Sequence, residues 1–376
     1  MAPKLVPNLQ NKTNYVVDIR NLKFYRDHGL VITKIHKVIT FRQERWMKPY
    51  IDFNTEKRKQ AKNEFEKDFF KLMCNSCFGK TMENLRNRID INFITSNSEM
   101  PKRLQLRERT VERHLASPLY DGHIIYSEHL AAIKKKKKQL LLNKPIYAGM
   151  CILDLSKLHM YEFHYDVIKK QYGDRAKLLF TDTDSLCYQI KTDDFYKDML
   201  GSKDLFDLSN FDPSSPFYDD TNKKVLGKFK DECDGQPPCE FVGLRPKMYS
   251  LKVEHTTHYT MGDEDESVKL QSGDNEVACQ AVTIKEKKTG KGIQRAFLKN
   301  QVVHADYRRC LLSEERCDKQ QLASFNVIRS QKHKVSSFEI NKVGLCAYDN
   351  KRFLLEDGIT SFSYGHAKIA GLSPAL

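Results

Sequence analysis

Apolar and polar positions alternate most clearly around a short polar stretch in the middle of the chain. Within residues 177–190, apolar runs flank four small polar residues, Asp182 to Ser185. Two short apolar runs separated by a small polar turn are typical of a tight β-hairpin. The pattern therefore predicts a hairpin that carries Asp182 and Asp184 at its tip.

Residues 57–83 have a helical period instead, and they predict one amphipathic helix. Apolar side chains gather on one side of this helix. A solvated face bordered by acidic residues explains the polar side, and a binding surface for a triphosphate explains it equally. The polar side is formed by five residues at a spacing of four: Lys59, Asn63, Lys67, Lys71 and Asn75.

The rest of the pattern predicts further helices, strands and loops. Helices are expected at residues 14–28, 147–169 and 298–313, and strands at residues 30–41, 89–95, 240–244 and 327–345. Loops are expected at residues 101–111, 262–267 and 285–292, and the lysine run 134–138 is expected to be a solvated loop or a helix end.

The composition is that of a globular protein of two or three structural units, with 376 residues of which 40% are hydrophobic. The sequence has no apolar run long enough to span a membrane and no secretory leader, so an intracellular protein without a membrane partner is expected. Its 63 Lys and Arg residues exceed its 49 Asp and Glu residues, giving a formal charge of +14. This excess suits a polyanionic partner. The lysine run is compatible with nuclear import, which leaves the nucleus open as a location.

The ten cysteines are scattered, and we expect reduced thiols that mostly fill the core. Cys74 and Cys77 have zinc-like spacing, but they lie inside the predicted helix and no second pair completes four ligands. Cys233 and Cys239, in a glycine- and proline-containing loop, are the better candidates for a loop metal site.

The two aspartates at the predicted hairpin tip are candidate metal ligands. Residues 180–190 contain no lysine or arginine to neutralise them, and hard carboxylate oxygens suit a divalent cation such as Mg²⁺ or Mn²⁺. Asp-Thr-Asp is equally compatible with a plain turn, because Asp and Thr bond their own backbone. These residues alone leave the two interpretations level.

Three motifs in order resemble those of family B DNA polymerases. Residues 71–79 read Lys-x-x-x-Asn-Ser-x-Phe-Gly and residues 181–185 read Thr-Asp-Thr-Asp-Ser, similar to the second and third polymerase motifs. Residues 247–249 match the Lys-x-Tyr motif that follows them in the family. The resemblance is strongest to the protein-primed type of viruses, linear plasmids and self-synthesising transposons, and it extends from about Leu22 to His366.

The resemblance implies an α+β fold, with a right-hand polymerase palm built on an antiparallel sheet, helical fingers and a mixed thumb. Five segments follow from it: a palm-entry helix and strand at residues 1–55, a fingers helix at 56–84, a palm insertion at 85–145, the palm with the metal hairpin at 146–240, and the primer-grip segment with the thumb at 241–376.

The resemblance also implies DNA-templated transfer of nucleotides from dNTPs to a primer 3′ hydroxyl, with Mg²⁺ or Mn²⁺. The partners are then a DNA primer–template and dNTPs, and a terminal protein as primer is left open. The implied site residues are Asp184 and Asp182 as catalytic metal ligands, Lys59, Lys67, Lys71, Asn75 and Phe78 around the incoming dNTP, and Lys247 and Tyr249 at the primer terminus.

The sequence departs from the family in several places. The first polymerase motif, Asp-x-x-Ser-Leu-Tyr-Pro, and the exonuclease domain are absent. Two carboxylates on one hairpin do not suffice to bridge two metal ions. We therefore expect the C-terminal part of a larger or split polymerase, or a non-catalytic relic that binds nucleic acid; a metal-dependent nuclease has no need for the lysines of residues 57–83. Phe78 replaces a frequent Tyr, and Thr181 replaces a frequent Gly.

Overall fold

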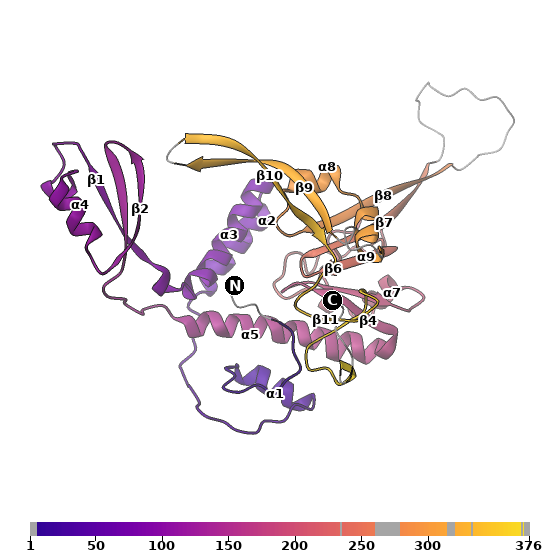
Figure 1. Ribbon diagram of the computed structural model, residues 1–376. Coiled ribbons are helices and arrows are strands. Elements are labelled where there is room, and N and C mark those ends of the chain that lie inside the picture. The colour runs from indigo at the N-terminus through magenta and orange to yellow at the C-terminus, as the bar shows by residue number, and fades with distance from the viewer. Residues whose placement is uncertain are drawn as a thin grey trace, which may run out of the picture. The chain divides into compact units, whose positions relative to one another are not determined.

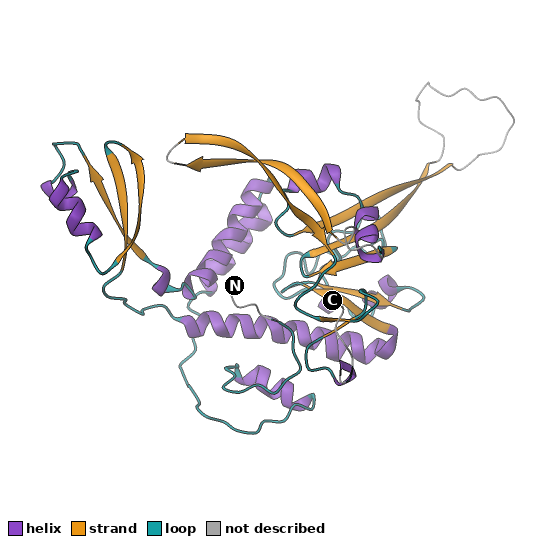
Figure 2. Ribbon diagram, viewed as in Figure 1, coloured by secondary structure: helices purple, strands orange, loops and turns teal. Residues whose placement is uncertain are grey.

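The computed structural model describes residues 6–233, 235–259, 279–313, 320–331, 334–369 and Gly371. Two compact units make up the chain: unit 1 comprises residues 1–15, 168–325 and 339–376, and unit 2 comprises residues 16–167 and 326–338. Both units combine helices with antiparallel strands (Figures 1 and 2), which confirms the expected α+β class. The acidic stretch 262–267 lies outside the described residues.

Unit 1 is built on a three-stranded antiparallel sheet of order β6-β7-β8. Two helices, α8 and α9, pack on one face of it, and the antiparallel pair β4 and β5 forms the predicted hairpin. The elements of unit 1 are α6 (Lys170–Tyr172), β4 (Ala176–Thr181), β5 (Leu186–Ile190), α7 (Phe195–Leu200), β6 (Glu240–Arg245), β7 (Met248–Tyr259), β8 (Cys279–Gly290), α8 (Arg295–Gln301), α9 (His304–Leu312), β11 (Phe353–Leu354) and β12 (Ser361–Phe362).

The core of unit 1 lies between the sheet and its two helices. Tyr307 of α9 is completely buried, and Met248 of β7 is 1% exposed. The Tyr307 hydroxyl donates to the carbonyl of Thr289 at 3.1 Å, which ties α9 to β8. The buried members of this cluster are Val242, Leu244, Met248, Ile293, Leu298, Val302, Tyr307, Cys310, Leu345 and Ala347.

Unit 2 contains long helices and a second three-stranded antiparallel sheet, of order β1-β3-β2. A further hairpin, β9 (Gln320–Gln331) with β10 (Lys334–Cys346), is divided between the two units. The elements of unit 2 are α1 (Ile19–Asp27), α2 (Lys48–Gln60), α3 (Glu64–Thr81), β1 (Ile89–Thr95), α4 (Glu108–Leu115), β2 (Tyr120–Ser127), β3 (Leu130–Lys136) and α5 (Ile146–Glu162), which continues as a π-helical turn (Phe163–Lys169).

Hydrogen bonds join the first helix of unit 2 to α5. Asp18 is the N-cap of α1, and its carboxylate accepts from the backbone N–H of Arg20. The carboxylate and carbonyl of Asp154 accept from the Asp18 backbone N–H at 2.8 Å and from the Asn21 amide at 2.6 Å. Asp18, Asn21 and Asp154 are all buried. Their bonds therefore fix α1 on α5, although the buried Asn21 side-chain oxygen has no hydrogen-bond partner in the described chain.

The predicted helix 57–83 is wrong in one respect, because the chain breaks it at residues 61–63 into α2 and α3. Asn63 caps α3: its side chain accepts from the Glu66 backbone N–H at 2.9 Å. The Glu66 carboxylate in turn accepts from the Asn63 amide and from the Lys62 backbone N–H. This reciprocal cap resembles a capping box, and it makes a new helix start more favourable than continuation.

Several other local predictions also differ from the structure. Residues 30–41 form no strand, because no neighbouring strand pairs with this β-branched run in the described chain. The helix predicted at residues 298–313 is interrupted between α8 and α9, and the expected loop 101–111 contains the start of α4. The lysine run enters β3, and residues 285–290 belong to β8. In these two basic stretches, pairing with a neighbouring strand decides the conformation.

The close approach of α3 and α5 requires a glycine at position 149. A Cβ built there would lie 2.5 Å from Thr81 Oγ1 and nearer still to Met82 Cγ, whereas a Cβ at Gly79 of α3 meets nothing within 4 Å. Gly149→Ala is expected to lower the free energy of unfolding by about 1–3 kcal/mol, because the crowded side chains must move. Gly79→Ala, the matched control, should raise it by about 0.5–1 kcal/mol through helix propensity. Urea unfolding of both variants measures these changes. If the two substitutions changed the free energy of unfolding equally, the close packing of α3 on α5 at Gly149 would be contradicted.

Candidate active site

The tip of the β4–β5 hairpin presents the two predicted metal ligands. A two-residue loop, Thr183-Asp184, is closed by Asp182 and Ser185: Asp182 N–H donates to the Ser185 carbonyl at 3.1 Å, and Ser185 N–H donates back at 3.2 Å. Asp184 is exposed, and Asp182 is partly buried. Among the described residues, no ion pair engages the Asp184 carboxylate. The hairpin therefore holds Asp184 open to solvent on a rigid support.

A second turn, between β6 and β7, meets this tip within unit 1. Lys247 lies in the turn, and its Nζ is 3.3 Å from Asp182 Oδ1. Residues 180–190 contain no lysine, as the sequence shows, but the tertiary fold brings one to Asp182 from the later β6–β7 turn. Two of the three polymerase-like motifs therefore meet at one place.

Aromatic rings connect the strands behind the two tips. Phe180 of β4 stacks on Tyr249 of β7, with ring centroids 4.2 Å apart, and it also lies 5.8 Å from the ring of Phe241 on β6. The β4–β5 pairing has a bulge between Leu178 and Phe180, and bulges redirect side chains. This stack holds the hairpin on the sheet face opposite to the one that packs on α8 and α9. Sequence reasoning missed Phe180 and Phe241; an aromatic residue just before the paired aspartates was the only available signal.

The hairpin tip and the β6–β7 turn both contain backbone strain. Thr183 has φ +57° and Lys247 has φ +61°, and they are two of the four non-glycine residues with positive φ in the described chain. Such a conformation costs about 1–3 kcal/mol in a residue with a Cβ. The Lys247–Asp182 ion pair is solvated, with 56% and 40% of the two side chains exposed, and such pairs contribute about 0–1 kcal/mol. The pair does not offset the strain, so stability does not explain a lysine in this turn.

The donor set at the hairpin suits a single hard cation only in part. Asp182 and Asp184 supply carboxylate oxygens, the ligands that Mg²⁺ prefers. Within the described residues, however, no group of three or more His, Cys, Asp or Glu side chains is placed to hold a metal ion. Two carboxylates from one hairpin can begin a metal site, but they do not bridge two ions.

The predicted triphosphate-binding residues lie in unit 2, and the structure divides them between two helices. Lys67, Lys71, Asn75 and Phe78 belong to α3, while Lys59 belongs to α2, so the expected continuous stripe is wrong for Lys59. Lys67 Nζ pairs with Glu64 Oε1 at 2.5 Å. Lys71 and Asn75 are exposed, and Phe78 is half-buried. On α3 the spacing of four keeps Lys67, Lys71 and Asn75 on one face.

The apolar side of α3 is unusually open. Phe65 is 78% exposed and Leu72 is 58% exposed. The packed side is instead the one that carries Cys74 and Cys77, which face α2 near Tyr50 and Arg58. Burial raises the pKa of the Cys74 thiol. Both cysteines are free but only partly buried. Among the described free cysteines only Cys310 and Cys346 are buried, so the expectation that the thiols mostly fill the core is wrong.

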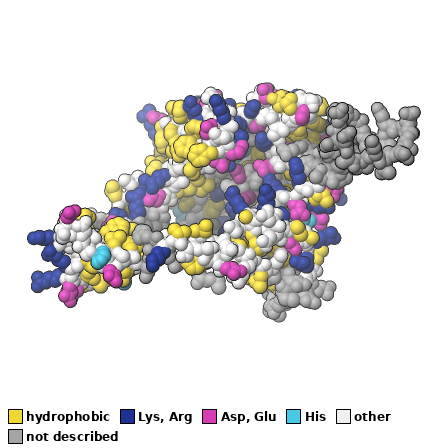
Figure 3. Space-filling model, turned by 90° about the horizontal axis from the view of Figure 1, so that it is seen from above, with side chains coloured by type: hydrophobic (Ala, Val, Ile, Leu, Met, Phe, Trp, Pro, Cys, Tyr) yellow, Lys and Arg dark blue, Asp and Glu magenta, His cyan; other side chains and the backbone are white. Residues whose placement is uncertain are grey.

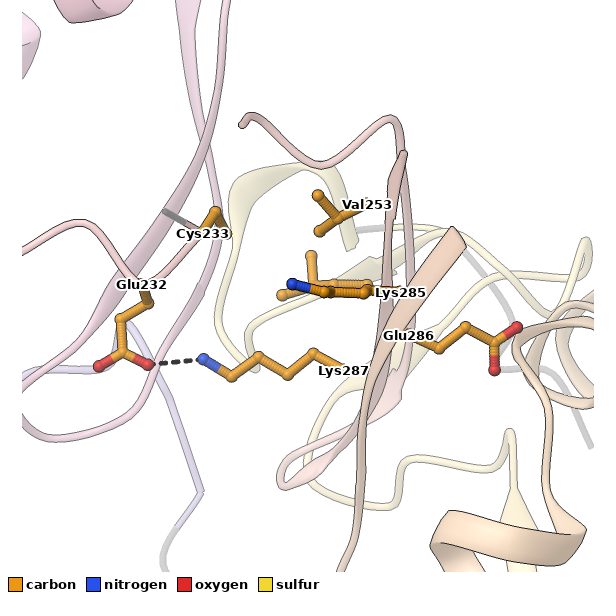
Figure 4. A pocket seen from close by; sticks show the side chains of 7 residues that line it. Glu232, Cys233, Val253, Lys285, Glu286 and Lys287 are labelled. Atoms are coloured by element: carbon orange, nitrogen blue, oxygen red, sulfur yellow. Dashed lines mark hydrogen bonds and ion pairs between the residues drawn. The ribbon is translucent and has the colours of Figure 1, made fainter. Parts of the chain in front are cut away.

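A pocket of about 250 Å³ in unit 1 contains none of the predicted polymerase-site residues, but it includes Cys233, a candidate for a loop metal site (Figure 4). Lys287 extends into it and pairs with Glu232 at 2.6 Å. Burial raises the pKa of Cys233 to about 11, and it does the same for Cys187 of β5, so both thiols stay protonated at neutral pH. The pocket is thus lined by the Lys287–Glu232 ion pair and by one protonated thiol, that of Cys233. Its lining residues are Glu232, Cys233, Leu251, Val253, Lys285, Glu286 and Lys287.

Basic side chains gather on the β1–β3–β2 sheet and α4 of unit 2. Figure 3 shows Lys and Arg side chains protruding over these elements. On the central strand, Lys134 is paired across the sheet with Ile91, and Ile91 is 50% exposed. Lys137 forms an ion pair with Asp90 at 2.6 Å. The lysine run is therefore part of a sheet that displays positive charge together with apolar side chains.

Comparison with known proteins bears on one part of the chain. A family model described as DNA polymerase type B, organellar and viral, matches residues 7–169. This match covers less than half of the 376 residues; it includes α3 but ends before the β4–β5 hairpin. No curated protein and no solved structure matches the chain. The match supports a relationship to type B DNA polymerases and, broadly, DNA polymerase function, with DNA and dNTPs as the implied substrates.

None of the helices in the described part of the chain combines the length and the apolarity that crossing a lipid bilayer requires.

Proposed function

We propose that this chain provides the palm, fingers and thumb of a DNA-templated DNA polymerase of the protein-primed type. The observation that carries the proposal is the meeting of the hairpin tip and the Lys-x-Tyr turn in unit 1: Lys247 lies 3.3 Å from Asp182, and Tyr249 stacks on Phe180. The family match over residues 7–169 supports it independently, because that stretch contains α3 and not the hairpin. The five segments expected from the resemblance remain part of this proposal, as does an origin in a virus-like or mobile element.

In this proposal Asp184 and Asp182 hold Mg²⁺ or Mn²⁺. The bound ion would lower the pKa of the primer 3′ hydroxyl and neutralise charge on the leaving pyrophosphate. Asp184 is the main ligand because its carboxylate is exposed, and Asp182 is the weaker one because Lys247 already pairs with it. Since the hairpin supplies only two carboxylates, we propose that the chain acts as the C-terminal part of a larger enzyme or as one subunit of a split enzyme.

The residues of α3 would bind the incoming nucleotide. Lys71 and Lys67 would pair with triphosphate oxygens, and Asn75 would donate to the nucleotide. Phe78 would pack under the sugar and base, so that shape excludes a ribose hydroxyl even without the hydroxyl of a tyrosine. Lys59, on α2, would contribute only longer-range attraction to the phosphates.

The β6–β7 turn would hold the primer. Lys247 would contact a phosphate near the primer terminus, and Tyr249 would support its sugar; such backbone contacts fix register without reading sequence. The basic sheet of residues 89–136 would correspond to the insertion between the second and third motifs that, in protein-primed relatives, helps to displace the non-template strand. A terminal protein as primer belongs to the same proposal.

The alternative is a polymerase relic that binds nucleic acid without copying it. The Lys247–Asp182 pair favours it, since a lysine that stays on a metal ligand blocks part of the site. The net charge of +14 is compatible with either function.

Primer extension separates the two functions. The full chain is incubated with a 5′-labelled primer on a DNA template, with Mg²⁺ and dNTPs supplied singly or together. If the chain is a polymerase, only the dNTP complementary to the first template base should extend the primer when it is given alone, and EDTA should stop extension. Salt-sensitive DNA binding without any extension, with Mg²⁺ and with Mn²⁺, would instead support a chain that is non-catalytic by itself, either the relic or a subunit of a split polymerase.

Lys71 and Lys67 are expected to contribute unequally to dNTP binding. Lys71→Ala should raise the KM for dNTP about tenfold, the effect of roughly 1.4 kcal/mol of lost attraction at an exposed site. Lys67→Ala should raise it less, because Glu64 already compensates part of the Lys67 charge. Steady-state incorporation measures both, with Lys80→Ala, an exposed lysine of the same helix paired with Glu83, as the control. If Lys71→Ala left the KM for dNTP unchanged, Lys71 would not be part of the dNTP-binding site.

A further inference from the structure

Lys247 is held in its strained turn beside Asp182 although the pair does little for stability. The turn is Pro246-Lys247, closed by the pairing of Arg245 with Met248. Glycine or asparagine is the usual choice at the second position of a proline-led turn when φ is positive. What a lysine adds at this position is its ammonium group, which lies 3.3 Å from Asp182 Oδ1.

The backbones of the hairpin tip and of the β6–β7 turn are fixed, whereas the side chains of Lys247 and Asp182 can move. The Phe180–Tyr249 and Phe180–Phe241 ring contacts hold β4 on the β6–β7 strands. Lys247, by contrast, carries its charge on a flexible four-carbon stem, and both Lys247 and Asp182 remain open to solvent. A small rotation of the lysine side chain breaks the ion pair without moving the hairpin.

We propose that Lys247 is an exchangeable counter-ion of Asp182, so that divalent-cation binding at the hairpin and phosphate binding at the turn favour each other. When a cation binds at Asp182 and Asp184, the ammonium is displaced and becomes available to a DNA phosphate. When a DNA phosphate draws the ammonium away, Asp182 becomes available to the cation. By thermodynamic linkage, each ligand must raise the affinity of the other by the same factor. This inference rests on the proposed function, which places the cation and the DNA at these residues.

The test measures Mn²⁺ binding to the full chain, with and without a short DNA primer–template duplex. Free Mn²⁺ is followed by electron paramagnetic resonance, with duplex alone as the blank. In the wild-type chain the duplex is expected to raise Mn²⁺ affinity about two- to fivefold, the range that a solvated ion pair supplies. Without duplex, the Lys247→Met variant should already bind Mn²⁺ about two- to fivefold more tightly than the wild-type chain does. Adding the duplex should raise the Mn²⁺ affinity of this variant little further.

The matched control is Lys177→Met, which removes an exposed lysine from the same hairpin. Lys177 lies on β4 opposite Gln189, away from the tip. This variant should keep both the wild-type Mn²⁺ affinity and its response to the duplex. If Lys177→Met changes them as much as Lys247→Met does, the effect is general electrostatics and the exchange is overturned.

Asp184→Ala distinguishes failure of this inference from failure of the proposed function. If Asp184→Ala abolishes Mn²⁺ binding but Lys247→Met leaves the Mn²⁺ affinity unchanged or lowers it, the exchange is overturned. The hairpin then remains the proposed metal site. Absence of any Mn²⁺ binding that depends on Asp184 overturns the metal hairpin and the exchange together.

Discussion

Asp184→Ala is expected to abolish primer extension almost completely, by about 10³-fold or more. The carboxylate is exposed at the hairpin tip, and no ion pair engages it in the described chain. Its removal takes away the main ligand of the proposed metal site, and metal stabilisation of the reacting oxygens supplies several kcal/mol; about 4 kcal/mol corresponds to 10³-fold. Single-nucleotide incorporation under saturating dNTP measures the change.

Two comparisons make this result specific. Asp182→Ala should cause a smaller loss than Asp184→Ala, because Asp182 shares its carboxylate with Lys247. Asp193→Ala removes an exposed aspartate just beyond β5 and should leave incorporation unchanged. Because exposed substitutions change the free energy of unfolding by only about 0.5 kcal/mol, Asp184→Ala and Asp193→Ala should unfold at the wild-type urea concentration. Asp182→Ala also loses a solvated ion pair with Lys247, which contributes about 0–1 kcal/mol. Incorporation by Asp184→Ala at the wild-type rate would exclude the hairpin as the catalytic centre.

Tyr307→Ala is expected to cause the largest loss of stability, about 3–5 kcal/mol. The ring is completely buried between α9 and the β6–β7–β8 sheet, and the cavity left behind adds to the lost burial. Such a loss is a large part of the 5–15 kcal/mol that typically stabilises a domain. Urea unfolding followed by circular dichroism measures it.

Tyr307→Phe separates the ring from the hydroxyl. This variant keeps the buried ring and loses only the hydrogen bond to the Thr289 carbonyl, at a cost of about 1 kcal/mol. Burial raises the pKa of Tyr307 above its usual 10.0, so the unfolded chain loses this proton first and stability falls as pH rises past 10. The phenylalanine variant should lose less stability between neutral pH and pH 11. A Tyr307→Ala variant as stable as Tyr307→Phe would show that the ring is not part of the core.

The elements predicted correctly are those whose local pattern and tertiary surroundings agree. Residues 89–95 alternate as a strand and form β1, and the hairpin with Asp182 and Asp184 at its tip forms as β4 and β5. The largely apolar run from residue 147 forms α5 and its π-helical continuation. In these cases short-range periodicity was sufficient to predict the type of element. It did not predict which side is buried, since Ile91 of β1 is 50% exposed and Ile152 of α5 is 42% exposed.

The failed predictions share a different cause. Residues 30–41 have strong strand propensity, yet a strand also requires a partner, and none pairs with them in the described chain. The lysine run looks solvated, but as β3 it is the central strand between β1 and β2. The break at Asn63 was visible as Asn-x-x-Glu, a capping signal that the longer amphipathic pattern concealed.

The sequence by itself determined the chemistry at the candidate site: two carboxylates at a hairpin tip, and lysines with an amide at a spacing of four, which α3 keeps on one face. These features depend on the period of a strand or a helix, so neighbouring residues are enough to specify them. Only the tertiary structure decided that Lys247 neutralises Asp182 and that Phe180 stacks on Tyr249. These contacts join β4 and its tip to strands and a turn that come much later in the chain, and local periodicity carries no information about which distant segments meet.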